Sequence, residues 1–237
     1  MDTRKIATLT GWLMVVTFVT SIPAYFFLYA PVRNNPGSIT GAGADPTASV
    51  ALGAVLEIIL IIAQFGTAVV PYALFRRYSE SLALGYVAAR LVECMFTAIG
   101  IISLLTFVFM RQEGTAGTDA ALGQAFVAIY DRAFLIGPGI FAGVANGMIL
   151  GYLMYRSGLV PRGMAMLGLI GGPLLVAAAI AVLFDVIDRG SAVQGIATIP
   201  EAAWELSFGI YLIVKGFRPS AIQAGIDSRP VARAAGA

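Results

Sequence analysis

Residues 82–110 read LALGYVAARLVECMFTAIGIISLLTFVFM, an apolar run interrupted by Arg90 and Glu93. A helix of this length can cross about 30 Å of hydrocarbon, for which roughly 20 residues suffice. The run lacks the alternating pattern of a membrane-barrel strand, and backbone groups in hydrocarbon must be paired within their own segment, so a helix is expected. The two charges, three residues apart, then share one face of that helix.

Comparable apolar runs occupy residues 6–29, 49–75, 122–155, 164–184 and 199–214. With residues 82–110 they predict an all-α polytopic membrane protein, in which residues 1–218 form one domain with a bundle of six transmembrane helices. Gly137-Pro138 interrupts the longest run and predicts a kink there. Residues 219–237 are small, polar and Arg-bearing, so we expect a flexible cytoplasmic tail.

Composition supports the same class over the whole chain. Of 237 residues, 59% are apolar and only 12% are charged, and the mean hydropathy is +0.86, so the bilayer is the expected solvent and partner. A net charge of +2 leaves no polycationic surface for nucleic acid. The chain has no His, which excludes imidazole metal sites and Ser-His or Cys-His catalytic pairs. The single cysteine, Cys94, excludes a disulfide framework and a cluster of cysteine metal ligands. From these absences we predict no metal site and no catalytic residue, and we assign no cofactor.

Basic residues predict how the chain is threaded. They concentrate before the first run, after the second, between the fourth and fifth, and after the sixth, at Arg4, Lys5, Arg76, Arg77, Arg156, Arg162, Lys215, Arg218, Arg229 and Arg233. The alternate loops carry only Arg33, Arg111 and Arg189. The positive-inside rule then puts both termini in the cytoplasm, which requires an even number of spans.

Ionisable residues within the runs are the candidate site. Each would cost roughly 2.5 to 3.5 kcal/mol at a lipid-facing helix centre, so we expect them to face one another. Glu57 and Gln64 are seven residues apart and Glu201 and Glu205 are four apart, so each pair lies on one helix face. The predicted substrate- or ion-binding set is Glu57, Gln64, Arg90, Glu93, Asp131, Arg132, Glu201 and Glu205.

The charges of this set do not balance. Five carboxylates oppose two guanidinium groups, and the surplus must be neutralised by protons, a bound cation or water. We expect Arg90 to pair with Glu93 near the middle of the membrane, and Arg132 to pair with an acid of a neighbouring helix. The other acids would then line an acidic vestibule open to the outside. A structural interpretation stays open, in which the charges fix helix register and Asp131 or Glu201 caps a helix N-terminus.

Glycines at four-residue spacing predict close helix packing. One stripe comprises Gly139, Gly143, Gly147 and Gly151, and a shorter one on the next run comprises Gly168 and Gly172. We expect the longer stripe to contact another helix of this chain or of a second copy, so the possibility of a homo-oligomer stays open.

Several segments resemble one known family. They are GLVPR at 158–162, LGLIGGP at 167–173, IPE at 199–201, WELS at 204–207 and KGFRP at 215–219. Together they resemble the bacterial, mainly actinobacterial, integral-membrane family of domain of unknown function 4386 (DUF4386). The resemblance covers most of the chain up to Arg218 and is most specific in the last third. It implies a helical multi-pass protein of the bacterial plasma membrane and singles out Glu201 and Glu205, but it implies no activity.

Three functional hypotheses follow. The first is binding or permeation of a small cationic or amine-bearing solute, with proton coupling as an option, through the acidic vestibule. The second is a non-transporting sensory or assembly partner whose buried charges specify helix packing. The third is a carboxylate-metal membrane enzyme, which is disfavoured because oxygen ligands alone specify no particular reaction. A water-filled cavity would favour the first hypothesis, and a dry, fully paired cluster would favour the second.

Overall fold

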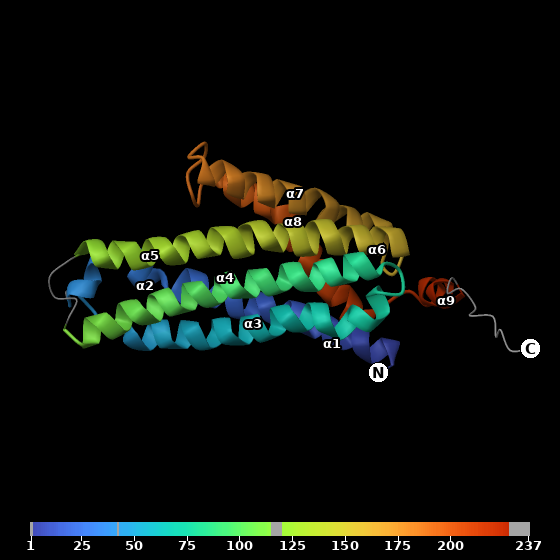
Figure 1. Ribbon diagram of the computed structural model, residues 1–237, viewed down its shortest axis with the longest axis horizontal. Coiled ribbons are helices and arrows are strands. Elements are labelled where there is room, and N and C mark those ends of the chain that lie inside the picture. The colour runs from blue at the N-terminus through green and yellow to red at the C-terminus, as the bar shows by residue number, and fades with distance from the viewer. Residues whose placement is uncertain (1, 42, 115–119, 228–237) are drawn as a thin grey trace, which may run out of the picture.

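The computed structural model describes residues 2–41, 43–114 and 120–227. Within these ranges every regular element is a helix, which confirms the all-α fold class. Figure 1 shows long helices side by side in an elongated bundle, with the N-terminus and the last helix at the same end. We call this the terminal end and the opposite one the loop end.

The helices have the following bounds. The first span is α1 (Thr3–Pro23), continued by a π-helical segment, η1 (Ala24–Leu28). The short helices α2 (Ala30–Arg33) and η2 (Pro36–Thr40) follow at the loop end. Next come α3 (Thr47–Phe75) and α4 (Glu80–Gln112). A continuous helix then comprises α5 (Ala120–Phe134), η3 (Leu135–Phe141), η4 (Gly143–Leu150) and α6 (Gly151–Ser157). The chain continues with α7 (Arg162–Leu183), α8 (Ala192–Val214) and α9 (Pro219–Asp227).

Among the described residues, five helices are long and apolar enough to cross a membrane: Thr3–Leu28, Thr47–Phe75, Glu80–Gln112, Ala120–Ser157 and Arg162–Leu183. Helix α8 has 23 residues, carries Glu201 and Glu205, and is not among these five. By length and composition the described part of the chain is therefore an α-helical protein of membrane type.

Two segments differ from the sequence-based boundaries. Helix α8 begins at Ala192 rather than at 199, because the Ser191 hydroxyl accepts a hydrogen bond from the Gln194 N–H and so caps a polar first turn that hydropathy does not reveal. The start of the predicted flexible tail is a helix, α9. The Tyr78 hydroxyl donates to the Ala221 carbonyl at 2.9 Å, which holds α9 against the bundle. Residues 228–237 of that tail lie outside the described part.

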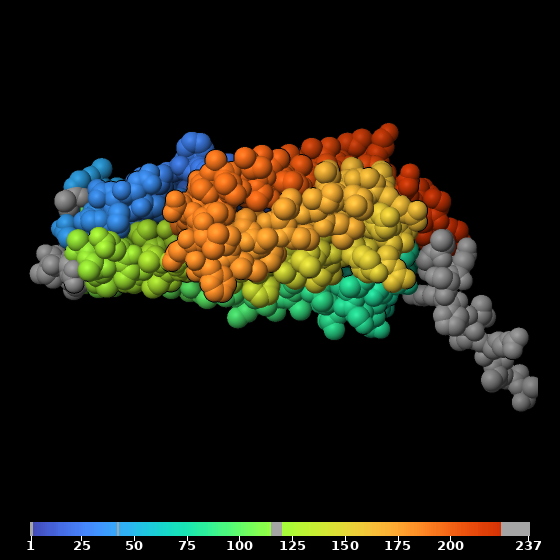
Figure 2. Space-filling model, turned by 90° about the horizontal axis from the view of Figure 1, so that it is seen from above, coloured from blue at the N-terminus to red at the C-terminus, as the bar shows by residue number. Residues whose placement is uncertain are grey.

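The long helices form a closed ring. Each packs against the next along the chain, α1 on α3, α3 on α4, α4 on α5, η4 on α7 and α7 on α8, and α8 returns to pack on α1. Figure 2 shows that the α7–α8 connection (orange) stops short of the loop end reached by α5 and the α1–α2 segment. The ring is therefore built of neighbours in sequence, and its interior is enclosed by six helices.

Glycines set the spacing of the helices in one half of the ring. A Cβ at Gly143 would lie 2.8 Å from the Gly172 carbonyl oxygen, and one at Gly147 would overlap the same backbone. Gly168 faces the Trp204 indole in the same way. The stripe therefore contacts α7 of the same chain, where backbones approach too closely for a side chain. The interruption predicted at Gly137-Pro138 takes the form of π-helical turns within a continuous helix.

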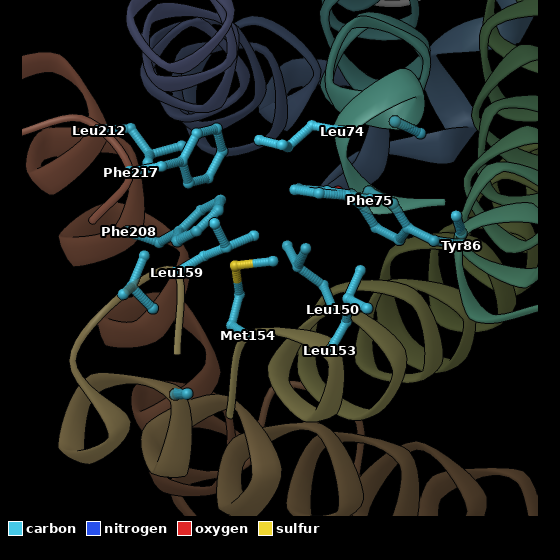
Figure 3. Packing of buried hydrophobic residues seen from close by; sticks show 14 of the residues in the cluster. Leu74, Phe75, Tyr86, Leu150, Leu153, Met154, Leu159, Phe208, Leu212 and Phe217 are labelled. Carbon is cyan, nitrogen blue, oxygen red and sulfur yellow. The ribbon is translucent and has the colours of Figure 1, made fainter. Parts of the chain in front are cut away.

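An apolar cluster lies toward each end of the ring. At the terminal end, helices α3, α4, α6 and α8 and the segment after α8 bring together Leu74, Phe75, Tyr86, Leu153, Met154, Phe208, Leu212 and Phe217 (Figure 3). Near the loop end, Tyr29, Val32, Ile39, Phe107 and Val127 form a second cluster. Between the two clusters, the side chains that point inward include most of the buried polar ones.

Candidate functional site

The ring encloses a cavity of about 260 Å³ to which α1, α3, α4, α5, α7 and α8 all contribute. Part of its wall is apolar, with Phe18, Phe96, Phe134 and Leu175. Six of the eight predicted site residues line this one cavity, namely Glu57, Gln64, Arg90, Glu93, Glu201 and Glu205. The two others, Asp131 and Arg132, are not in its wall.

Arg90 and Glu93 form the ion pair that their spacing predicts. The Arg90 Nη1 donates to Glu93 Oε2 at 2.7 Å, and both residues are 2% exposed. The Gln64 amide donates to the other oxygen, Glu93 Oε1, at 2.8 Å, and Arg90 Nε donates to the Gln64 carbonyl at 3.3 Å. Both oxygens of this carboxylate are thus occupied, and the pair ties α3 to α4.

Asn146 connects three helices at the terminal side of the cavity. Its side-chain amide donates to Glu205 Oε1, and the Tyr86 hydroxyl donates to its Oδ1 at 3.0 Å. Its backbone carbonyl accepts from the Trp204 indole at 2.8 Å. Sequence reasoning does not include Asn146 in the site, although an amide within an apolar run is itself a signal.

Glu57 is held by two phenols at the loop side of the cavity. The Tyr29 hydroxyl donates to Oε2 at 3.1 Å and the Tyr130 hydroxyl donates to Oε1 at 3.3 Å. The two rings meet edge to face at 5.2 Å, and Glu57 is 3% exposed. Neither tyrosine is predicted from sequence, because Tyr29 lies in the bend between η1 and α2 and Tyr130 lies in α5, and only the packing brings them to Glu57 on α3.

Glu201 differs from the other acids. It is 2% exposed, it lines the cavity, and neither of its carboxylate oxygens has a hydrogen-bond partner within the described residues. Gly171 and Gly147 hold it close to two helices, because a Cβ at Gly171 would meet the Glu201 backbone and one at Gly147 would lie 2.6 Å from Oε2. A buried carboxylate without a donor is costly, so this position is suited to a proton or a cationic group.

The helix-cap interpretation of two acids is wrong. Helix α8 begins at Ala192 and is capped by Ser191, so Glu201 lies well inside it. Asp131 likewise lies far from the start of α5 at Ala120. Neither carboxylate is near the unpaired N–H groups of a first turn.

Asp131 and Arg132 do not join the predicted cluster. Asp131 Oδ1 lies 3.4 Å from Arg33 Nε, and its other oxygen is paired with Arg189. Arg132 is exposed and forms no ion pair with an acid of the described residues, so its predicted pairing is wrong. Successive helical residues point about 100° apart, so when Asp131 faces the bundle Arg132 faces away.

Tyr25 completes this ionic cluster at the loop side. Arg33 donates to its hydroxyl at 2.7 Å and lies 3.8 Å above its ring, and Arg189 donates to the same hydroxyl at 3.2 Å. Tyr25 and Arg189 also line the cavity. Sequence analysis misses both arginines as site residues, since they lie in connections that looked like ordinary loops.

The acids are spread along the cavity rather than gathered at one point. Within the described residues, no group of three or more His, Cys, Asp or Glu side chains is placed to hold a metal ion. Fold and cavity together define a helical protein of membrane type with an acidic, partly aromatic interior.

The sequence model of the family described as Domain of unknown function (DUF4386) matches residues 9–216, and the chain belongs to this family. The matched range includes every residue that lines the cavity. No curated protein and no solved structure matches the chain. The family description names no activity, so function must be argued from the cavity.

Proposed function

We propose that this protein is a six-span protein of the bacterial plasma membrane that binds a small cationic or amine-bearing solute in the cavity and allows it to permeate. The observation that carries the proposal is Glu201, a buried carboxylate in the cavity wall with both oxygens unpartnered. An ammonium group would supply the donors that it lacks.

The charge of the cavity wall supports a cationic ligand. Four carboxylates, Glu57, Glu93, Glu201 and Glu205, face the guanidinium groups of Arg90 and Arg189. Arg90 forms an ion pair with Glu93, and Arg189 forms one with Asp131, which lies outside the cavity wall. The remaining negative charge therefore needs an external cation or protons.

The threading proposed here takes α8 as the sixth span and both termini as cytoplasmic. Six crossings agree with the N-terminus and α9 lying at one end of the bundle (Figure 1). The large apolar cluster with Phe75, Phe208 and Phe217 seals the cavity at that end. Tyr25, Arg189 and Gln194 line it toward the loop end, which supports access from outside.

The alternative of a non-transporting partner requires a fully paired charge cluster. Arg90, Glu93 and Gln64 meet that requirement, but Glu201 does not, and a cavity lies beside it. These two observations favour solute binding over a purely structural role. The metal-enzyme hypothesis gains no support from the spacing of the acids in the described residues.

Binding and uptake of small amines test the proposal. We expect n-butylamine to raise the thermal unfolding temperature of the purified protein saturably, and methylammonium to enter protein-containing liposomes faster than empty ones. Glu201→Gln should weaken binding at least about tenfold, since a charge-assisted hydrogen bond contributes roughly 1.5 to 3 kcal/mol. Glu113→Gln, at an exposed position after α4, is the matched control and should behave as the parent. Equal binding by both variants would contradict the proposal.

A further inference from the structure

Two acids without a cationic partner, Glu57 and Glu201, lie far apart along the cavity. One continuous helix contacts both: the Tyr130 hydroxyl donates to Glu57 at 3.3 Å, and a Cβ at Gly147 would lie 2.6 Å from Glu201 Oε2. Tyr130 and Gly147 are seventeen residues apart in sequence, and at 1.5 Å per residue, or less in the π-helical turns of η3 and η4, their backbones lie about 20 to 25 Å apart along the helix. Glu57 is therefore the acid near the loop end, and Glu201 is the acid near the terminal end.

The acid between these two positions is already neutralised. A Cβ at Gly137 would lie 3.3 Å from the Glu93 carbonyl oxygen, so Glu93 stands at an intermediate level. Its carboxylate is bound by Arg90 and Gln64. The uncompensated charge is thus concentrated at the two ends, at Glu57 and at Glu201 with Glu205.

The wall between the two ends is largely apolar and aromatic, with Phe18, Phe96 and Phe134. Methylene groups are stabilised against such a surface, and ammonium groups are attracted to aromatic faces. A volume of about 260 Å³ extended over this length suits an unbranched chain. A compact inorganic cation would leave the apolar wall and one acidic end without a partner.

We infer that the preferred ligand of this cavity is a linear aliphatic polyamine, with one terminal ammonium group at Glu57 and the other at Glu201. This inference rests on the proposed function and adds the ligand class to it. The phenols of Tyr29 and Tyr130 orient the Glu57 carboxylate, while the unpartnered oxygens of Glu201 accept the opposite end of the chain.

The first test measures the affinity of the unmodified binding site for diamines of different chain length. Trp204 donates to Asn146, which binds Glu205, so its fluorescence should respond to a ligand at this end. The chain has two tryptophans, and Trp12→Phe leaves Trp204 as the reporter. We expect 1,12-diaminododecane, which is long enough to reach from Glu57 to Glu201, to bind at least about tenfold more tightly than 1,2-diaminoethane, which has the same number of amines but cannot reach both acids. The tetraamine spermine, whose terminal amines are equally far apart, should likewise bind at least about tenfold more tightly than n-butylamine.

Two variants locate the ends of the ligand. Glu57→Gln keeps one carbonyl acceptor, and its amide N–H can donate to the second phenol oxygen. This variant should lower the affinity for spermine about tenfold and that for n-butylamine much less, because a single ammonium group can bind at Glu201. Glu201→Gln should weaken both ligands, and Glu113→Gln should weaken neither.

The outcomes separate this inference from the proposed function. If n-butylamine binds as tightly as spermine, or 1,2-diaminoethane as tightly as 1,12-diaminododecane, the inference is wrong and amine binding stands. A preference for Mg²⁺ over spermine would likewise overturn it. If no amine binds, the inference and the proposed function both fall.

Discussion

Glu201 and Glu205 lie one helical turn apart on α8, yet their surroundings differ completely. Glu205 accepts from the Asn146 amide, whereas Glu201 has no donor among the described residues. Both acids lie on one face, as their spacing predicts. Which of the two carboxylates accepts a hydrogen bond depends on a single residue of another helix, Asn146.

Arg90 provides a prediction at the same scale. Arg90→Gln leaves Glu93 with only the Gln64 amide, and loss of one partner of a buried ion pair costs about 3 to 5 kcal/mol. We expect a clear drop in the thermal unfolding temperature in detergent. Arg76→Gln, at an exposed position after α3, removes an equal charge and is the control. If the two variants unfold at the same temperature, the pair contributes nothing to stability.

At the scale of elements, the long helix from α5 to α6 makes two kinds of contact with its neighbours, close backbone packing and polar hydrogen bonds. Residues Ala120–Ser157 are helical throughout, and the π-helical turns of η3 and η4 carry Pro138 and Asn146. One face of η4 is glycine against α7, while Asn146 reaches α4 and α8. Close backbone contact and polar contact thus come from the same segment.

Gly143 tests the close packing of this segment. Gly143→Leu places a side chain where the Gly172 carbonyl oxygen and the Val176 side chain now lie, and overpacking of this kind costs roughly 1 to 3 kcal/mol or more. The measured quantity is the unfolding temperature in detergent, which should fall. Gly163→Leu, in α7 with open space around it, is the matched control and should unfold as the parent. A parent-like Gly143→Leu would show that η4 and α7 are less closely packed than described.

The whole molecule is a ring in which each span contacts its sequence neighbours and α8 closes onto α1. Closure is tight at the terminal end, where Gly11 of α1 lies against Gly209 of α8. Farther along, the same two helices contribute Thr17, Ser21, Thr198 and Glu201 to the cavity. The two helices are thus closely packed at the terminal end and separate farther along to admit the cavity, as the proposed solute binding requires.

Cysteine labelling tests the orientation of the ring. In a Cys94→Ser background, Ala44→Cys at the loop end and Ser220→Cys in α9 are both at exposed positions. An impermeant maleimide should label Ala44→Cys in intact cells and Ser220→Cys only after the membrane is opened, because the positive-inside rule puts the terminal end in the cytoplasm. Labelling of Ser220→Cys in intact cells would show that the terminal end lies outside the cell, and the proposed orientation of the cavity would then be wrong.

What the sequence by itself determined is the part governed by positions within one helix. Apolar runs predict the helices, and three-residue spacing predicts the Arg90–Glu93 pair, because helical geometry relates such residues without reference to the rest of the chain. The glycine stripe predicts a close contact for the same reason.

Only the tertiary structure decided which residues of different helices meet. Glu57 lies with Tyr29 and Tyr130, and Asp131 pairs with Arg33 and Arg189 rather than joining the other acids. The physical reason is that a contact between helices depends on the rotation of each helix about its axis and on the order of helices around the ring. A rotation of about 100° exchanges the places of Asp131 and Arg132, and no local spacing specifies it.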